Sequence, residues 1–209
     1  MGLTIALNKG RILKECLPLL SACGVEPSED PDKSRKLIFS SKDQECRYII
    51  TRSADVLTYV EHGVADIGIT GKDTILEYGE AMGFYELLDL NIGRCRMMTA
   101  APAEYQEPAG VLRVASKFVN IARDHYRRQG RQVELIKLSG AMEIAPLLDL
   151  ADCIVDIVDT GNTLKANGLI AGETICDIST RLIVNRASMK TKFDQVRSFT
   201  QNLADVIPQ

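Results

Sequence analysis

Apolar and polar positions alternate along the chain in a way that predicts short strands followed by short helices. The first apolar run, Leu3–Leu7, ends at the polar segment Asn8-Lys9-Gly10. Apolar residues then recur at helical spacing until Gly24, which predicts a helix directly after the first strand. This strand-then-helix order repeats along the chain and is typical of an α/β fold rich in parallel strands.

The other elements follow from the same two criteria, a β-rich apolar run for a strand and apolar residues at helical spacing for a helix. We predict further strands at residues 35–40, 47–51, 65–70, 85–90, 94–100, 112–115, 132–138, 153–158 and 173–185. We predict further helices at residues 55–62, 74–78, 117–129, 143–150, 163–167 and 193–206, the last one amphipathic. Between the strand at 65–70 and the helix at 74–78 we predict a turn at Gly71-Lys72-Asp73.

The pattern restarts near residue 110, after the segment Ala101-Pro102, and this restart predicts a second α/β lobe inserted into the first. We place domain I at residues 1–93 and 175–209, and domain II at residues 94–174. The chain has 209 residues, of which 45% are hydrophobic and 25% charged, so each lobe has enough apolar material for a core.

Composition excludes several classes of function. A net charge of −3, the absence of Trp and an aromatic content of 5% argue against a nucleic-acid binder. No apolar run reaches the ~18 residues that cross a bilayer, so we expect no membrane association. The six cysteines form no Cys-x-x-Cys pair, which favours free thiols and a cytoplasmic protein. Neither His62 nor His125 has a second ligand at metal-binding spacing, so we expect no protein metal site.

The strongest candidate for chemistry is Cys153–Leu164, where a buried strand runs into a turn of glycine and hydroxyl-bearing residues. Such a turn binds anions through backbone amides and hydroxyls, and the carboxylates upstream suit sugar hydroxyls or a phosphate-bound Mg²⁺. Asp156 and Asp159 are an odd number of residues apart, so we expect Asp159 to lie beyond the strand. The same turn also suits a plain connection in which Asp and Thr cap a helix. The candidate ligands are Asp156, Asp159, Thr160, Gly161, Asn162 and Thr163.

Three more candidates follow apolar strands, where ligands of open α/β sheets bind. Asn8–Arg11 puts two cations at a helix start, where the dipole disfavours them, so a polyphosphate ligand explains them better than a solvated surface. Arg52 and the segment Gly68–Asp73 also end strands, although a surface Arg beside a capping Asp55 is an equal alternative. Ser139–Glu143 suits either an anion-binding turn or a helix cap. No dinucleotide or P-loop spacing and no nucleophile–His–acid set is present.

Together these segments resemble the catalytic subunit of ATP phosphoribosyltransferase, the enzyme that opens histidine biosynthesis. The resemblance covers nearly the whole chain. Leu57 stands where the family usually has Pro, and Asp149 where it usually has Gly. Because the chain ends soon after its amphipathic helix, we expect the short form of the family. The segments that carry the resemblance are residues 6–11, 35–39, 52–71, 143–146 and, most specifically, 152–169.

The resemblance implies a two-lobed fold similar to the type II periplasmic binding proteins, with the active site in the interdomain cleft. It implies a transferase that joins N1 of the adenine of ATP to C1 of the ribose in phosphoribosyl pyrophosphate, with pyrophosphate leaving. It also implies Mg²⁺ held mainly by the substrate phosphates, a regulatory partner similar to the catalytic core of histidyl-tRNA synthetase, and a dimer of catalytic subunits.

Carried over residue by residue, the resemblance gives each candidate a role. The catalytic residues that neutralise pyrophosphate are Arg52, Lys9 and Arg35. The residues that bind phosphoribosyl pyrophosphate are Glu143, Asp156, Asp159, Thr160, Gly161, Asn162 and Thr163. The residues that bind ATP are Arg11, Gly71, Lys72 and Asp73.

Two other functions stay open from the residues alone. One is a non-catalytic two-lobed module that binds a small anion, and the other is a phosphoribosyltransferase that acts on a different base. The chain shows neither a signal peptide nor a DNA-binding helix pair, which a receptor or a transcriptional sensor would carry. The resemblance to the family at residues 9–11 and 52–71 implies ATP rather than another base.

Overall fold

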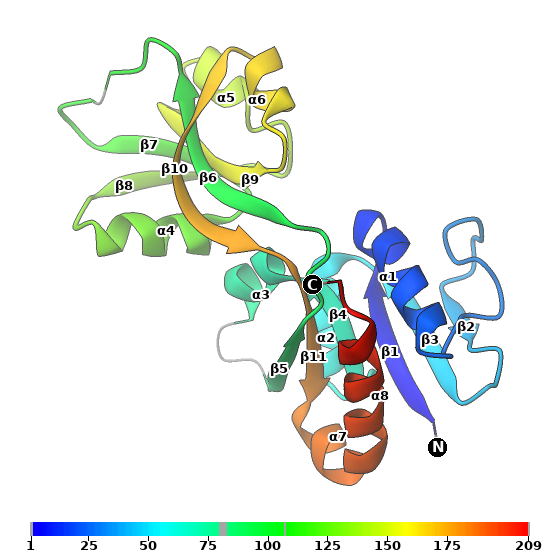
Figure 1. Cartoon of the computed structure of the whole chain (residues 1–209). Helices are drawn as coiled ribbons and strands as arrows, with labels where there is room; N and C mark the ends of the chain where they lie inside the picture. The colour runs from blue at the N-terminus through cyan, green and yellow to red at the C-terminus, as the bar shows by residue number, and fades with distance from the viewer. Residues whose placement is uncertain (1, 80–82, 107, 209) are drawn as a thin grey trace. The chain divides into compact units, whose positions relative to one another are not determined.

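The protein is described by a computed structural model that covers residues 2–79, 83–106 and 108–208. The chain divides into two compact units, Met1–Gly93 with Ser179–Gln209, and Arg94–Ile178. Each unit has its own mixed sheet with helices on both faces (Figure 1). The two-lobed α/β architecture that the sequence predicted is therefore confirmed.

The first boundary between the units lies after residue 93, where the sequence predicted it, but the second lies after residue 178 rather than 174. The reason is the length of strand β10 (Leu169–Ile178), which pairs with β6 (Cys95–Pro102) as far as Ile178 opposite Cys95. The predicted strand at 173–185 is in fact two strands that belong to different sheets, β10 and β11 (Thr180–Asn185).

Unit 1 is built on a six-stranded sheet of order β2-β3-β1-β4-β11-β5, in which β3, β1 and β4 are parallel. Its strands, besides β11, are β1 (Leu3–Asn8), β2 (Ile38–Ser40), β3 (Cys46–Thr51), β4 (Ile67–Gly71) and β5 (Phe84–Asp89). Its helices are α1 (Arg11–Ala22), α2 (Ser53–Glu61), α3 (Lys72–Tyr78), α7 (Arg186–Thr191) and α8 (Phe193–Val206).

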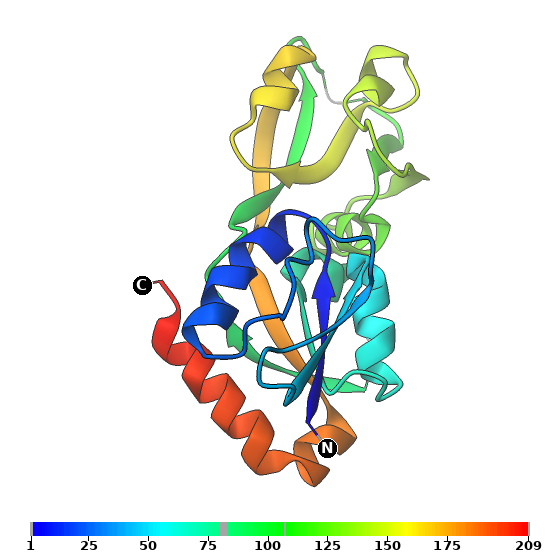
Figure 2. The ribbon, with the colours of Figure 1, turned by 90° about the vertical axis from the view of Figure 1, so that its right-hand side faces the viewer.

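The alternation of side chains along β1 explains how the helices cover this sheet. Ile5 and Leu7 point to the face where α1 and α8 pack side by side, whereas Ala6 points to the face covered by α2. Figure 2 shows α1 and α8 on one side of the sheet and α2 on the other. Leu57, one of the two departures from the family pattern, is fully buried in α2 and leaves that helix unbroken.

Unit 2 is built on a five-stranded sheet of order β10-β6-β9-β7-β8, in which β9, β7 and β8 are parallel. One face is covered by α4 and the other by α5 and α6 (Figure 1). The remaining elements of this unit are β7 (Leu112–Ser116), α4 (Val119–Arg128), β8 (Val133–Lys137), α5 (Ile144–Leu147), β9 (Cys153–Val158) and α6 (Asn162–Ala166).

Two predicted elements differ from the structure for local reasons. The helix predicted at 143–150 is only Ile144–Leu147, and Asp149 just beyond it has a φ of +54°, a conformation that glycine adopts more readily. The C-terminal helix at 193–206 is confirmed, but a further short helix, α7, precedes it. The side chain of Asn185 caps α7 by accepting hydrogen bonds from the amides of Ala187 and Ser188.

In the part of the chain that the structure describes, every helix is too short or too polar to reach from one side of a membrane to the other.

Candidate functional site

The carboxyl ends of β1, β3 and β4 lie next to one another at one edge of the unit 1 sheet, because these strands are parallel neighbours. Asn8, the last residue of β1, is in register with Thr51, the last residue of β3. The amide of Lys9 donates a 2.9 Å hydrogen bond to the carbonyl of Thr51. Lys9 and Arg52 therefore occupy adjacent positions at this edge, as the sequence predicted for residues that share one site.

Arg35 reaches the same edge from an antiparallel strand. The amide of Ile50 donates to the carbonyl of Leu37 at 2.8 Å, and Arg35 lies two residues before Leu37. The predicted strand at 35–40 is shorter, Ile38–Ser40, so Arg35 belongs to the loop before β2. Arg35, Lys9 and Arg52 are all exposed, and no carboxylate of the described residues lies within ion-pair distance of them. Three exposed cations without a described ion-pair partner at one sheet edge are the kind of groups that a highly charged anion needs as ligands.

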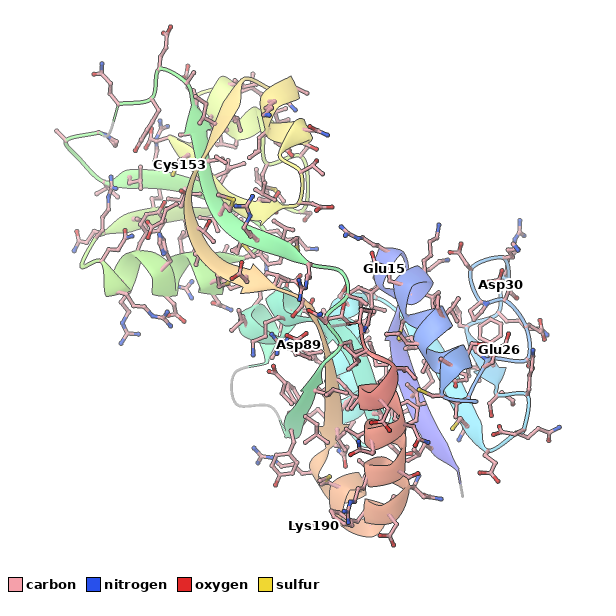
Figure 3. All side chains as sticks on the ribbon, viewed as in Figure 1. Glu15, Glu26, Asp30, Asp89, Cys153 and Lys190 are labelled. Carbon is pink, nitrogen blue, oxygen red and sulfur yellow. The ribbon has the colours of Figure 1, made fainter. Side chains whose placement is uncertain are left out.

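Arg11 and Lys72, two predicted ATP-binding residues, differ from these cations because each has an acidic partner. Arg11 Nε lies 2.7 Å from Oε1 of Glu15, whose other oxygen accepts from the amide of Gly93 at 2.7 Å (Figure 3 labels Glu15). Lys72 Nζ lies 2.6 Å from Oε2 of Glu86 on β5. A ligand that binds either cation through its charge must share it with a carboxylate of the protein.

The turn predicted at residues 71–73 differs from the structure. The segment Gly71-Lys72-Asp73 is not a free turn, because Gly71 is the last residue of β4 and pairs with Thr180 of β11, and Lys72 begins α3. A side chain at position 71 would collide with the carboxylate of Asp73, which lies back over the glycine. A larger residue at this strand-to-helix junction would therefore displace the Asp73 carboxylate from its position.

The corresponding edge of unit 2 is formed by the carboxyl ends of β7, β8 and β9. Asp156 lies inside β9 and Asp159 just beyond it, as predicted. Gly161 has a φ of +76° and precedes α6, while Thr160, Asn162 and Thr163 are exposed. These residues form an exposed turn into α6 that carries two hydroxyl groups and the side-chain amide of Asn162.

The alternative interpretation of this loop as a helix cap is weakly supported by its contacts. The Asn162 amide donates to Thr160 Oγ1 at 3.4 Å, and no side chain caps α6 at Gly161. Since α6 has only five residues, its dipole adds little, and anion binding would depend on the individual amides and hydroxyls of the loop.

At the carboxyl edge of the unit 1 sheet, Asp55 does not cap α2 either, because the N-cap position of this helix is Arg52.

Asp156 lies among charges of both signs. Burial raises its pKa above the usual value, the hydrogen bond from the Ile157 amide at 2.8 Å lowers it, the charge of Glu143 raises it, and that of Lys117 lowers it. Glu143 stands at the start of α5, so the predicted ribose ligands Asp156 and Glu143 are brought within electrostatic reach of one another. Sequence reasoning missed Lys117, although it follows β7 as Lys9 follows β1.

The turn Ser139–Glu143 has one strained residue. Ala141 adopts a φ of +52°, and Glu143 makes no side-chain cap to α5. The Glu143 carboxylate is therefore available to a ligand. This favours a ligand-binding role for Glu143 itself over an anion-binding role for the backbone of the turn. Across residues 2–79, 83–106 and 108–208, no group of three or more His, Cys, Asp or Glu side chains is arranged to hold a metal ion.

Comparison with known proteins identifies relatives over nearly the whole chain. A family model described as "HisG: ATP phosphoribosyltransferase" matches residues 52–205. The ATP phosphoribosyltransferase of Ectopseudomonas mendocina is 56% identical over 205 residues, 98% of this chain and 97% of that protein. That of Pseudomonas aeruginosa PAO1 is 57% identical with the same coverage. These relatives are hardly longer than the stretch they share with this chain, as expected for the short form.

A solved structure is similar to the whole fold. The chain matches the "ATP phosphoribosyl transferase (HisG:HisZ) complex from Thermotoga maritima" with a TM-score of 0.85 and 35% sequence identity. The match covers 98% of both chains. The similarity therefore includes both units and not only the segments that carry the candidate residues.

Proposed function

The chain belongs to the ATP phosphoribosyltransferase family, whose members catalyse the first step of histidine biosynthesis, and from this premise we propose how its residues carry out the transfer. The reaction joins N1 of the adenine of ATP to C1 of the ribose in phosphoribosyl pyrophosphate. A C–N bond forms, the C–O bond to pyrophosphate breaks, and the bonding electrons leave with the pyrophosphate. No protein nucleophile is required, so catalysis depends on positioning and on charge stabilisation.

The loop at the end of β9 binds the 5-phosphate of phosphoribosyl pyrophosphate in this proposal. Asp159, Thr160, Gly161, Asn162 and Thr163 offer amides and hydroxyls to the phosphate oxygens. Asp156 and Glu143 accept hydrogen bonds from the ribose hydroxyls. The effect of the Glu143 charge on the pKa of Asp156 supports this role, because two carboxylates within electrostatic reach of each other suit a pair of neighbouring hydroxyls.

The observation that carries the proposal is the gathering of Lys9, Arg52 and Arg35 at one sheet edge without acidic partners among the described residues. Pyrophosphate gains negative charge as it leaves, and cations that are already in place stabilise this charge more in the transition state than in the ground state. Arg11, with the segment 71–73, contacts ATP, and the ion pair of Lys72 with Glu86 holds the start of α3 in place for it.

Mg²⁺ would neutralise charge on the pyrophosphate when it is bound. Asp156 and Glu143 offer the hard oxygen donors that Mg²⁺ prefers. Mg²⁺ is usually bound by one or two protein carboxylates together with substrate phosphates, and two carboxylates fit this pattern. We therefore propose that the ion arrives with the substrate and that these carboxylates hold the ribose beside it.

We further propose that the chain pairs with a second copy and assembles with a regulatory subunit similar to the catalytic core of histidyl-tRNA synthetase. The second proposal is supported by the Thermotoga maritima match, which comes from a HisG:HisZ complex. The six cysteines, all in the described part of the chain, are thiols and not disulfides, which supports a location in the reducing cytoplasm.

Release of pyrophosphate tests the proposed function, with each substrate omitted in turn. We expect release only when ATP, phosphoribosyl pyrophosphate and Mg²⁺ are all present, with the regulatory subunit added in a parallel series. A module that only binds anions would release none under any condition. A phosphoribosyltransferase for another base would release pyrophosphate when ATP is replaced by that base, and either result would overturn the proposal.

A further inference from the structure

Lys117 lies at the carboxyl edge of unit 2, beside the loop that follows β9. Strands β7 and β9 are parallel neighbours, and Ser116 is in register with Val155. The next residues along the two strands are Lys117 and Asp156, so the chain places them next to each other at this edge. Asp159–Thr163 follows β9 directly, at the same carboxyl edge of the sheet.

The position of Lys117 is fixed by buried contacts of its two neighbours. The hydroxyl of Ser116, which is fully buried, donates to the Val155 carbonyl at 2.6 Å and accepts from the Phe118 amide at 2.8 Å. These two bonds tie the end of β7 to β9 and fix the backbone on both sides of Lys117. The Lys117 ammonium lies 5.6 Å from the centre of the buried Phe118 ring, which restricts the side chain further.

The ammonium of Lys117 forms no ion pair in the described part of the protein. The side chain is exposed, and no described carboxylate lies within ion-pair distance of its ammonium. The segment Asp159-Thr160-Gly161-Asn162-Thr163 contains no basic residue, so a doubly charged phosphate in this loop would meet amides and hydroxyls but no full positive charge. An ammonium group next to the loop supplies that charge.

We propose that Lys117 is a further substrate-binding residue, whose ammonium contacts the 5-phosphate of phosphoribosyl pyrophosphate; this inference rests on the proposed function. The electrostatic influence of Lys117 on the pKa of Asp156 supports the proximity that the strand register establishes. Lys117 thus lies between the loop that binds the 5-phosphate and Asp156, the carboxylate assigned to the ribose. In this position it fixes the phosphate relative to the ribose.

Binding of ribose 5-phosphate, measured by titration calorimetry on the purified chain, tests this role without requiring turnover. We expect Lys117→Met to weaken binding about tenfold or more, the usual loss for a charge-assisted contact. We expect Lys117→Arg to restore binding to within about threefold, because it keeps the charge at the same place. The matched control is Arg128→Met, which removes one exposed charge of unit 2 at the far end of α4, ~15 Å along the helix, and should leave binding unchanged.

Steady-state kinetics provide the second measurement. Lys117→Met should raise KM for phosphoribosyl pyrophosphate about tenfold while KM for ATP changes less than about twofold. The thermal unfolding midpoint should stay that of the parent protein, because the side chain is exposed. Lys165, in the last turn of α6, is the basic residue that follows the loop in the chain. Unchanged ribose 5-phosphate binding in folded Lys117→Met, or a loss of binding in Lys165→Met instead, would overturn the inference. If the parent protein releases no pyrophosphate, only the proposed function is contradicted. The role of Lys117 is then still decided by the titration with ribose 5-phosphate, which needs no turnover.

Discussion

Lys9 and Arg52 follow the ends of two neighbouring parallel strands, and the amide of Lys9 donates a 2.9 Å hydrogen bond to the carbonyl of Thr51, the residue before Arg52. Both cations are exposed and form no ion pair with a described carboxylate. The strand register therefore fixes the backbone of two cations at neighbouring positions, and an anion bound there could contact both.

Arg52→Ala should lower turnover at least about 100-fold, the usual loss when one preorganised charge-stabilising group is removed. Stability should change little, because Arg52 is exposed and makes no side-chain cap to α2. The matched control is Arg47→Ala, which removes an exposed arginine from the other end of the same strand. Pyrophosphate release and a thermal melt of each variant provide the measurement. Turnover at the parent level in folded Arg52→Ala would refute the role of Arg52.

Gly161→Ala should impair binding of phosphoribosyl pyrophosphate more than it impairs folding. The φ of +76° costs an alanine about 1 kcal/mol, although a methyl group there meets only Val158 at 3.8 Å. In the proposed site that methyl group would face the phosphate, so KM for phosphoribosyl pyrophosphate should rise about tenfold.

Gly168→Ala is the control for this prediction. Gly168 has nearly the same backbone conformation, a φ of +70°, with nothing within 4 Å of an added methyl group, and it lies after α6. Both substitutions should lower the unfolding midpoint equally, and only Gly161→Ala should raise KM. An equal rise of KM in both variants would show that backbone strain, and not the phosphate contact, is responsible.

The positions of Lys9 and Arg52 at the carboxyl edge of the unit 1 sheet could be predicted from the sequence, but the ion pairs at this edge could not. Lys9 and Arg52 could be placed because each follows an apolar run, and parallel strands bring their carboxyl ends together. The pairing of Lys72 with Glu86 could not be predicted, because it depends on β5 packing beside β11, which is far away in the chain. Lys117 was missed because no glycine-rich turn accompanies it.

The boundary between the units shows a second limit. Ile178 and Thr180 both belong to β-rich sequence, so local pattern gives one strand, whereas the chain passes from one sheet to the other at Ser179. Which sheet a strand joins is decided by its partners. Ile178 pairs with Cys95, and Thr180 pairs with Gly71.

Asp66→Asn should destabilise unit 1 by about 2 kcal/mol, because it removes a buried carboxylate whose charge-assisted hydrogen bonds include one from the half-buried Lys192. Asp66 is buried and accepts from Lys192 Nζ at 2.7 Å, Ser188 Oγ at 2.6 Å and the Thr4 amide at 2.8 Å. These bonds tie the C-terminal return of the chain to β1. Asp177→Asn, which alters an exposed carboxylate of unit 2, is the control and should have little effect on denaturant unfolding.

The same carboxylate predicts a pH dependence. Burial opposes ionisation of Asp66, but the hydrogen bonds from Lys192, Ser188 and Thr4 outweigh burial and lower its pKa. Because the folded pKa is the lower one, the stabilisation is complete above the unfolded pKa of about 4 and is lost as pH falls through the folded value. Unfolding free energies measured between pH 7 and pH 2 should therefore fall less steeply at the acid end for Asp66→Asn. Parallel curves for the two proteins would contradict this assignment.

At position 149 the order of stability should be Gly, then Asp, then Ala. Asp149 has a φ of +54°, a conformation that costs most residues about 1 kcal/mol and that Asp tolerates better than Ala. The side chain is exposed, whereas the backbone carbonyl accepts a 2.7 Å hydrogen bond from Arg113, which a substitution at 149 leaves intact. Calorimetric unfolding of Asp149→Gly and Asp149→Ala measures the order directly, and turnover should stay at the parent level in both. If the glycine variant proved the least stable of the three, the Asp149 side chain would itself stabilise the turn, and strain would not explain why the family usually has Gly there.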